Sequence, residues 1–431
     1  MKKNILIMSY YFPPCNLTPS ERLYSWAKYF HENNLYPTVV TRNWDVSIKN
    51  LNNEFTATGD ETKYEKNEYY EVYYVPYKPD LKQKLFKKYS GTRFYFLYLI
   101  ISFLYNILEN FTSYFTSYLP LFSFSKKMLS EKKFSFLLIS GSPFHLFKFG
   151  YKLHKKYNIP WAADYRDDWN TNEIFVSNGA IKKMIQKLSL RNEKKWVNTA
   201  AFFTSVSDYY VQKIQKNLSI KGHTILNGFM PENYSNLPPC APREKFTISY
   251  VGSLYESQPI EIFIEAAKRM TSEGKLLKIQ FIGLLSQKQA MLRIQKLIPG
   301  IEDFLVFTDR LAKEKVIQTQ HESDLLLICS HSNIKGTPGS KLYEYIALQK
   351  PVLVCPSDHD IIEETLQFTR QGIFANDSEV CYKVLSDLYD SWKRDGSISN
   401  AVQISSVNCD SFSRKTQALK LSKLINEEIA D

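Results

Sequence analysis

Short apolar runs alternate with stretches of helical periodicity along most of this chain. In the first half the runs predict strands at residues 4–8, 38–41, 71–75, 136–139, 161–164, 201–205 and 224–226, with a helix at 19–33. The same alternation begins again in the second half, with strands predicted at 246–251, 278–282, 304–307, 325–329 and 351–354, and with a helix at 259–270. Apolar strands that alternate with helices are typical of parallel sheets covered by helices on both faces. The pattern therefore predicts an α/β fold.

A proline-rich segment separates the two halves. Residues 237–242 contain three prolines in six positions, which is typical of a linker. The length of 431 residues also exceeds the roughly 250–300 residues that one hydrophobic core serves. We therefore predict two Rossmann-like domains at residues 1–237 and 244–405, and we expect a last helix at 410–431 to pack back on the first domain.

Motifs that are absent narrow the chemistry. Neither half carries GxGxxG after its first strand, and no GxxxxGK[ST] occurs, so neither a dinucleotide cofactor nor a P-loop is expected. The six cysteines form no CxxC or Cys/His cluster, so we expect no metal site and thiols of a reducing compartment. No apolar run is long enough for a membrane span or a signal-peptide core. We expect a cytoplasmic protein without a cofactor.

Basic and aromatic residues concentrate at residues 80–108, in a chain whose formal net charge is +11. Five basic residues precede the apolar run 94–108: Lys82, Lys84, Lys87, Lys88 and Arg93. An amphipathic segment with a basic flank suits the surface of an anionic membrane. A core helix with a solvated charged loop is the alternative. Nucleic-acid binding is not expected, because no recognised module accompanies the charge.

A turn followed by a helix is predicted directly after the strand 325–329. Pro338 and Gly339 allow a tight turn, and the helix should begin near Ser340. The free N–H groups and the positive dipole end of such a helix form an anion site. Lys341 adds a cation to the first turn, which a bound phosphate would favour.

Glu344 lies one turn into this helix, on the same side as Lys341. A carboxylate in that position can accept hydrogen bonds from the hydroxyls of a ribose. An ordinary strand–turn–helix with a Lys–Glu pair on its surface explains the same spacing equally well.

The amino-acid sequence of residues 336–351 resembles the donor-site signature of retaining GT-B glycosyltransferases of family four (glycosyl transferases group 1), in the branch that builds bacterial surface polysaccharides. The matching residues are Pro338, Lys341, Glu344, Tyr345, Ala347, Lys350 and Pro351. The resemblance implies that Glu344 binds the donor ribose and that Gly339, Ser340 and Leu342 bind the diphosphate through their backbone. We also expect donor contacts at Gly252 and Ser253, and we expect Arg310 to supply a cation to the diphosphate.

Other segments resemble the same family in the expected order. They are residues 5–14, 159–169, 204–207, 225–229 and 250–254. Departures also occur: Gly336 stands where the family commonly has the first Glu of its Glu-x7-Glu pattern, and Ser253 and Gln258 stand near the usual positions of a basic pair. Residues 15–19 replace a Gly pair in the first loop.

Candidate acceptor and catalytic residues lie at predicted strand ends in the first half, where parallel sheets place their ligands. Asp164, Arg166, Asp167 and Trp169 follow the strand 161–164 within six residues, and His145 follows the strand 136–139. We interpret Arg166, Asp167 and His145 as catalytic. Asp164, Trp169 and Pro14 in the first loop would contact the acceptor. The alternatives are an internal Asp–Arg salt bridge and a partly buried structural histidine.

The resemblance implies two Rossmann-like domains whose parallel sheets face a central cleft. It implies transfer of a sugar, with retention, from a nucleotide-sugar (a UDP-sugar is favoured) to a glycan or lipid-linked acceptor, as in capsule or lipopolysaccharide synthesis. It also implies a front-face reaction, in which the donor phosphate helps to deprotonate the acceptor and no protein nucleophile is invoked. A nucleotide-sugar 2-epimerase of the same fold and a non-catalytic nucleotide- or carbohydrate-binding protein are the alternatives.

Overall fold

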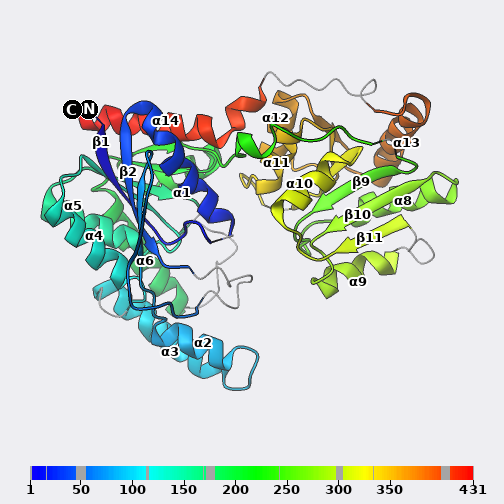
Figure 1. The fold of residues 1–431 in the computed structure, drawn as a ribbon. Coiled ribbons are helices and arrows are strands. Elements are labelled where there is room, and N and C mark those ends of the chain that lie inside the picture. Colours follow the sequence, from blue (N-terminus) through cyan, green and yellow to red (C-terminus); the bar gives the residue numbers. More distant parts are fainter. Residues whose placement is uncertain are drawn as a thin grey trace. The chain divides into compact units, whose positions relative to one another are not determined.

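The computed structural model describes residues 2–15, 17–44, 55–112, 116–167, 169–170, 180–241, 243–297, 304–332, 334–398 and 408–430. The chain forms two compact units, Met1–Leu226 with Gln417–Asp431 and Asn227–Thr416. Each unit is built on a sheet with helices packed against it (Figure 1). The α/β fold predicted from the apolar pattern is therefore confirmed for both halves.

Unit 1 contains an eight-stranded sheet in the order β3-β4-β2-β1-β5-β6-β7-β8. All neighbouring strands are parallel except β3 and β4, which are antiparallel. The strands are β1 (Lys3–Ser9), β2 (Leu35–Arg42), β3 (Lys63–Lys66), β4 (Glu71–Val75), β5 (Phe136–Ser140), β6 (Trp161–Tyr165), β7 (Phe202–Ser205) and β8 (Lys221–Thr224).

Helices occupy most connections of unit 1. They are α1 (Thr18–Tyr29), the 3-10 helix η1 (Phe30–Asn33), α2 (Leu81–Tyr89), α3 (Tyr95–Phe111), α4 (Leu119–Glu131), α5 (Leu146–Tyr157), α6 (Ala180–Val197), α7 (Asp208–Gln215) and α14 (Arg414–Ala430). The central strands are buried along most of their length, with Ile5, Leu6, Ile7 and Met8 of β1 fully covered. Burial on both faces explains why such runs are apolar at consecutive positions rather than at alternate ones.

Two details of unit 1 differ from the sequence-based prediction. The strand predicted at 224–226 lies instead at Lys221–Thr224, and the strand β3 at Lys63–Lys66 was not predicted. Both are strands at the sheet edges with polar or exposed residues, so an apolar run does not mark them.

Unit 2 contains a six-stranded, fully parallel sheet in the order β11-β10-β9-β12-β13-β14. The strands are β9 (Phe246–Val251), β10 (Leu277–Ile282), β11 (Leu305–Thr308), β12 (Leu325–Ile328), β13 (Val352–Val354) and β14 (Gly372–Phe374). The helices are η4 (Pro231–Asn233), α8 (Glu261–Ser272), α9 (Lys288–Leu297), α10 (Lys313–His321), α11 (Ser340–Leu348), α12 (Ile361–Phe368), α13 (Ser378–Asp395) and η6 (Cys409–Phe412).

The order of these strands positions the site. The chain builds the sheet outward from β9 through β10 to β11, then crosses back and adds β12 on the other side of β9. The strand order thus reverses between β9 and β12. Ligands of open parallel sheets bind beyond the carboxyl ends of the strands at such a reversal.

Two segments show how the chain passes between the units. The described part of the proline-rich segment lies within unit 2, where the carbonyl of Pro238 is 2.8 Å from Nε2 of His321. The last helix, α14, packs on unit 1, where Asn33 Nδ2 donates to Oγ of Ser422 at 2.6 Å and Asn426 Nδ2 donates to the carbonyl of Asn33 at 2.8 Å. Unit 1 is therefore assembled from both ends of the chain.

None of the helices in the described residues is both long and apolar enough to cross a membrane.

Candidate functional site

The end of β9 and the start of α11 meet at the reversal point of the unit 2 sheet. Gly252 follows β9 directly, and its φ of +108° lies in a region that L side chains rarely adopt. A Cβ at this position would lie 3.6 Å from Cε of Lys341. Two of the predicted donor-binding residues, which are far apart in the sequence, are thus neighbours in the structure.

The N-terminus of α11 is shaped for an anion. Gly339 is its N-cap, exposed and extended, and no side chain in the described residues caps the helix. The first-turn N–H groups of Ser340 and Lys341 therefore have no side-chain partner from the cap position. Leu342 N donates to the carbonyl of Gly339 at 3.1 Å, which closes the turn, and Pro338 beside it is buried. Such a helix start binds phosphate through backbone N–H groups and the helix dipole.

Lys341, Glu344 and Gln320 form a polar group beside this helix start. Lys341 Nζ lies 3.1 Å from Glu344 Oε2, and the two side chains are 34% and 20% exposed. Gln320 of α10 is fully buried and directs its Nε2 at the same carboxylate oxygen, 3.5 Å away. The ion pair is accessible to a ligand, and Gln320 holds the carboxylate of Glu344 in place. Lys341 and Glu344 can therefore exchange their contact with each other for contacts with a phosphate or a ribose hydroxyl.

An acidic side chain also stands at Gly336. The backbone N–H of Gly336 donates to Oδ2 of Asp360 at 2.5 Å, and Asp360 is partly exposed. Nearby, the carboxylate of Asp358 accepts from the backbone N–H groups of Ile362 and Glu363 and so fixes the start of α12. Asp360 therefore brings a carboxylate to the position where Glu is missing from the sequence pattern.

The other predicted donor residues lie farther from this group. Ser253 is exposed, and its carbonyl accepts from the hydroxyl of Tyr250 at 2.7 Å. Arg310 is exposed after β11, the edge strand, and no described contact joins it to Lys341. Gln258 is buried and donates to the carbonyl of Cys329 at 2.6 Å, so its amide fixes the loop after β9.

A buried network surrounds Asp164 at the carboxyl end of β6 in unit 1. Its carboxylate pairs with Arg22 of α1 at 2.7 Å and accepts hydrogen bonds from Ser140 at 2.9 Å and Thr204 at 2.8 Å. Arg22 continues to the carbonyl of Ile225 at 2.9 Å. Both charged side chains are at most 1% exposed. The network thus ties β5, β6 and β7 to α1, and the carboxylate of Asp164 faces protein groups on every described contact.

Arg166 and Asp167 lie just beyond this network and near the surface. They form an ion pair in which the Arg166 side chain is 18% exposed and the Asp167 side chain 52%. Arg166 also approaches Oγ of Ser142 at 3.4 Å and lies 5.7 Å from the ring centre of Tyr11. Three strand ends, those of β1, β5 and β6, therefore converge on the Arg166 guanidinium.

Trp169 forms an aromatic layer under this loop. Its ring stacks on Phe144 at 5.2 Å and on Trp196 of α6 at 6.2 Å. Asn170 donates to Glu193 of α6 at 2.7 Å. These contacts fix the loop that carries Arg166 and Asp167 against α6.

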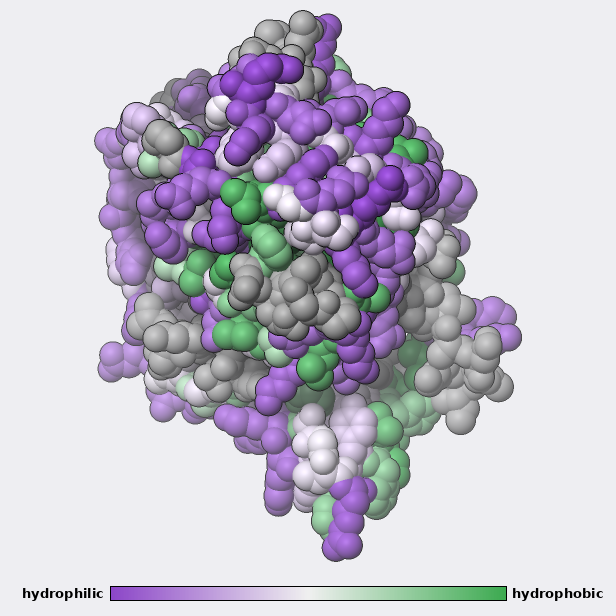
Figure 2. Space-filling model, turned by 90° about the vertical axis from the view of Figure 1, so that its right-hand side faces the viewer, coloured by the Kyte–Doolittle hydropathy of each residue, from purple (hydrophilic) through white to green (hydrophobic). Residues whose placement is uncertain are grey.

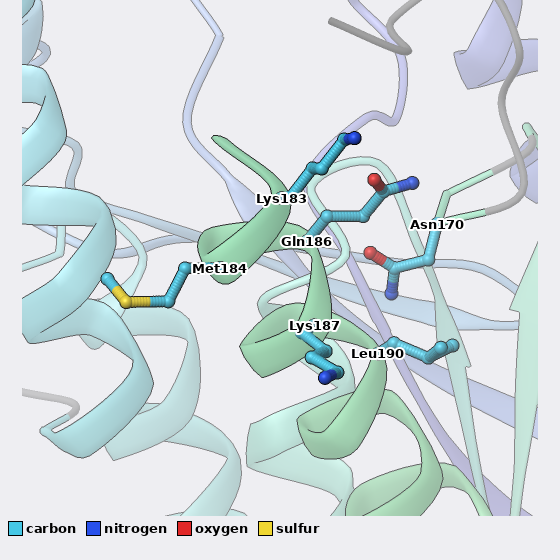
Figure 3. A pocket seen from close by; sticks show the side chains of 6 residues that line it. All are labelled: Asn170, Lys183, Met184, Gln186, Lys187 and Leu190. Carbon is cyan, nitrogen blue, oxygen red and sulfur yellow. The ribbon is translucent and has the colours of Figure 1, made fainter. Parts of the chain in front are cut away.

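A hollow of about 590 Å³ is lined by Asn170 and by residues of α6. Its lining residues are Asn170, Lys183, Met184, Gln186, Lys187 and Leu190. Figure 3 shows the polar ends of Lys183, Gln186 and Asn170 on one side of the helix and Met184 on the other. The surface of this hollow is mainly apolar, and its polar lining residues are two lysines and two amides. None of the lysines was predicted as a site residue.

His145 and Pro14 differ in their surroundings. The His145 ring packs edge-on against Phe149 at 5.4 Å and Trp196 at 6.2 Å, and its Nε2 is buried without a partner among the described atoms. Burial, together with the charge of Lys148, lowers the pKa of His145 to about 3, so the ring is neutral at physiological pH. Pro14 is exposed in the loop after β1, near Tyr11 in sequence.

The described residues contain no group of three or more His, Cys, Asp or Glu side chains arranged to hold a metal ion. All six cysteines are free thiols, and Cys329 and Cys355 are buried.

The chain is similar to solved structures over its whole length. Sucrose-phosphate synthase from Thermosynechococcus elongatus aligns over 100% of both chains with 12% identity and a TM-score of 0.64. A glycosyltransferase from Rickettsia africae aligns over 100% of this chain and 99% of that chain with 13% identity and a TM-score of 0.63. HepE from Anabaena, in complex with UDP and glucose, aligns over 99% of this chain and 100% of that chain with 12% identity and a TM-score of 0.59. At these identities the likeness shows the fold.

A search of curated proteins finds no match to the chain. Residues 240–400 match the model of the family Glycosyl transferases group 1, and this range includes α11 and the residues around Gly252. The chain therefore has the GT-B fold, with two Rossmann-like α/β units, and its residues 240–400 are similar to the Glycosyl transferases group 1 family.

Proposed function

We propose that this protein is a glycosyltransferase that moves a sugar from a nucleotide-sugar, with a UDP-sugar favoured, to a glycan or lipid-linked acceptor. The observation that carries the proposal is the group formed by Gly252, the open N-terminus of α11 and the Lys341–Glu344 pair at the sheet reversal. The family match covers this group, and HepE was solved with UDP and glucose.

In this proposal the diphosphate lies at the N-terminus of α11. The backbone N–H groups of Gly339, Ser340 and Lys341 and the ammonium of Lys341 bind its oxygens, and Glu344 accepts hydrogen bonds from the ribose. The N–H of Leu342 is already bonded to the carbonyl of Gly339 and so is not among these donors. During transfer the bond between the sugar C1 and the phosphate oxygen breaks, and negative charge grows on the leaving diphosphate. Donors fixed in place before the reaction stabilise this charge without reorganisation.

The sugar end of the donor lies toward Gly336. Because glycine has no side chain there, Asp360 would supply the carboxylate that binds a sugar hydroxyl, since it already contacts the backbone of Gly336. This substitution of one acid for another would preserve hydrogen bonding to the sugar while changing its geometry.

The acceptor binds unit 1 at the strand ends around Arg166. Asp167 and Arg166 contact its hydroxyls, and Tyr11 and Pro14 line the loop beside them. Asp164 acts as a positioning residue, because its carboxylate is buried under the site. Lys183 and Lys187 at the hollow beside α6 suit an acceptor that carries phosphate. The acceptor oxygen forms the new bond to C1 with retention, and its proton passes to the leaving phosphate.

We further propose that the protein acts in the cytoplasm, in the synthesis of bacterial surface polysaccharides.

The test is a thermal-shift screen of the purified chain with UDP-, GDP-, ADP- and dTDP-sugars, followed by a transfer assay with a radiolabelled form of the sugar that binds. A ligand that binds only the folded state raises the melting temperature. We expect stabilisation by UDP-sugars and transfer of label to a lipid or glycan fraction. No stabilisation by any donor would overturn the donor site, epimerised free donor would indicate a 2-epimerase, and binding without turnover would indicate a non-catalytic protein.

A further inference from the structure

The helices α2 and α3 form a hairpin that projects from unit 1 (Figure 1). Phe86 of α2 packs edge-on against Tyr98 of α3 at 5.2 Å, and Asp80 caps the start of α2. Lys148 of α5 anchors the other end, where its Nζ donates to the carbonyls of Glu109 at 2.7 Å and Thr112 at 2.9 Å. The hairpin is thus held at its base, and its outer surface remains open.

One side of α3 presents large apolar side chains to solvent. Phe96, Leu99, Ile100 and Leu104 are each more than 50% exposed, and Leu108 continues the row at 42%. Their spacing of three or four residues places them on one side of the helix. Figure 2 shows this projecting end at the bottom of the view, with hydrophobic residues beside strongly hydrophilic ones. A contiguous apolar surface of this kind marks an interaction site rather than ordinary exposure.

Basic residues flank the apolar stripe. Residues 80–111 contain five Lys or Arg residues and two Asp or Glu residues. Lys84, Lys87, Lys88 and Arg93 are exposed, on α2 and on the turn that leads to α3. Tyr89, Phe94 and Tyr95 lie among them. Apolar residues with aromatic side chains and lysines at their border are the composition of helices that lie in the headgroup layer of a membrane.

The length of α3 also favours a position along the surface. Its 17 residues extend about 25 Å, less than the ~30 Å hydrocarbon thickness that a spanning helix must cross. A second copy of the chain is a poorer partner, because a symmetric pairing through this surface would bring like charges together at its border.

We propose that the α2–α3 hairpin docks this protein on a bilayer that contains anionic lipids. The stripe from Phe96 to Leu108 enters the boundary between headgroups and acyl chains, and the basic residues of α2 lie over the anionic headgroups. The proposal concerns residues other than those of the proposed donor and acceptor sites and stands whether or not the chain transfers sugar.

The test is co-sedimentation of the full chain with vesicles of phosphatidylcholine alone or mixed with phosphatidylglycerol. We expect binding to the mixed vesicles that weakens as salt increases. Leu99→Ser with Ile100→Ser should abolish it. Lys87→Gln with Lys88→Gln should lower the partition coefficient about 25-fold, since each basic residue near the surface contributes about fivefold.

The matched control is Leu292→Ser on α9, which removes a leucine that is 50% exposed on the other unit. It should leave vesicle binding unchanged. Circular dichroism melts confirm that each variant is folded, and size-exclusion chromatography with light scattering reports the oligomeric state. The proposal is overturned if the wild-type chain stays in the supernatant with mixed vesicles, if the leucine and isoleucine variant still binds, or if that variant converts a dimer to a monomer instead.

Discussion

Lys341 and Glu344 form an ion pair of 3.1 Å across the first turn of α11, with Gln320 directed at the same carboxylate oxygen from α10. A cation at the start of a helix opposes the helix dipole, so the pair offsets an arrangement that is unfavourable for the helix itself. The arrangement becomes favourable when a diphosphate binds. A structural cost that a ligand relieves is consistent with a binding function for this turn.

Glu344→Ala should weaken donor binding about tenfold to a hundredfold, because hydrogen bonds to a charged group contribute about 1.5–3 kcal/mol. The dissociation constant for UDP-sugar, measured by titration calorimetry, checks this expectation. Glu344→Gln retains an accepting oxygen, so its dissociation constant should lie between those of the wild type and Glu344→Ala. Glu265→Ala on α8 removes an exposed glutamate elsewhere on the same unit and should bind donor like the wild type. Equal affinity of Glu344→Ala and the wild type would remove Glu344 from the site.

Gly252→Ala should reduce both stability and donor affinity. The φ of +108° at Gly252 would strain an alanine by about 1–3 kcal/mol, and the relaxed turn would shift the backbone beside Lys341. The control is Gly274→Ala, whose φ of +79° carries a similar strain in open space after α8. Urea unfolding and donor titration should show both variants destabilised but only Gly252→Ala impaired in binding. Normal donor affinity for Gly252→Ala would contradict a donor contact at Gly252.

Asp164→Asn should destabilise unit 1 by about 3–5 kcal/mol, because it leaves the guanidinium of Arg22 buried without its counter-charge. Urea unfolding followed by circular dichroism measures the loss. The double variant Arg22→Met with Asp164→Leu should lose less than the two single changes added together. A fully stable Asp164→Asn protein with impaired acceptor binding would instead support direct contact between Asp164 and the acceptor.

The pKa of His145 predicts a pH dependence. The folded value of about 3 lies below the ordinary 6.5, so below pH 6.5 the unfolded chain binds a proton that the folded chain does not. Stability therefore falls as pH drops from 6.5 toward 3, by about 1.4 kcal/mol per pH unit from this group. His145→Gln should lose this contribution, which shows as a smaller difference between urea midpoints at pH 7.5 and 5.5.

The same variant also tests catalysis. If His145 only packs against Phe149 and Trp196, His145→Gln should transfer sugar within about tenfold of the wild-type rate, since general acid–base catalysis typically contributes 10²–10⁴-fold. A folded variant slowed a hundredfold or more would place His145 among the catalytic residues.

The central strands could be predicted from the sequence because burial on both faces requires apolar residues at most of their positions. The last five residues of β1 and all of β9 are buried, and these positions are apolar, aromatic or carry a small hydroxyl group. The edge strands could not be predicted as readily. All four residues of Lys63–Lys66 are exposed, and Gly372–Phe374 has only three residues. Edge strands of this kind are held by backbone hydrogen bonds to one neighbouring strand, and such bonds leave no apolar pattern in the sequence.

Contacts within one helical turn could be predicted as well, since the separation of Lys341 and Glu344 fixes their proximity. Gln320, Asp360 and Tyr11 were not identified as site residues. Gln320 and Asp360 each lie 24 residues from the group they contact, and a crossover of the sheet brings them there. Their only signal in the sequence is a position near the sheet reversal, which becomes visible once the strand order is known.

The return of α14 to unit 1 has a consequence for synthesis of the chain. Asn33, near the start of unit 1, forms hydrogen bonds with Ser422 and Asn426. These two residues are translated after the whole of unit 2. Unit 2 can fold as a continuous segment on the ribosome, whereas unit 1 keeps an uncovered surface until α14 has been translated. Shortening the chain after Thr416 would therefore damage the unit that was synthesised first.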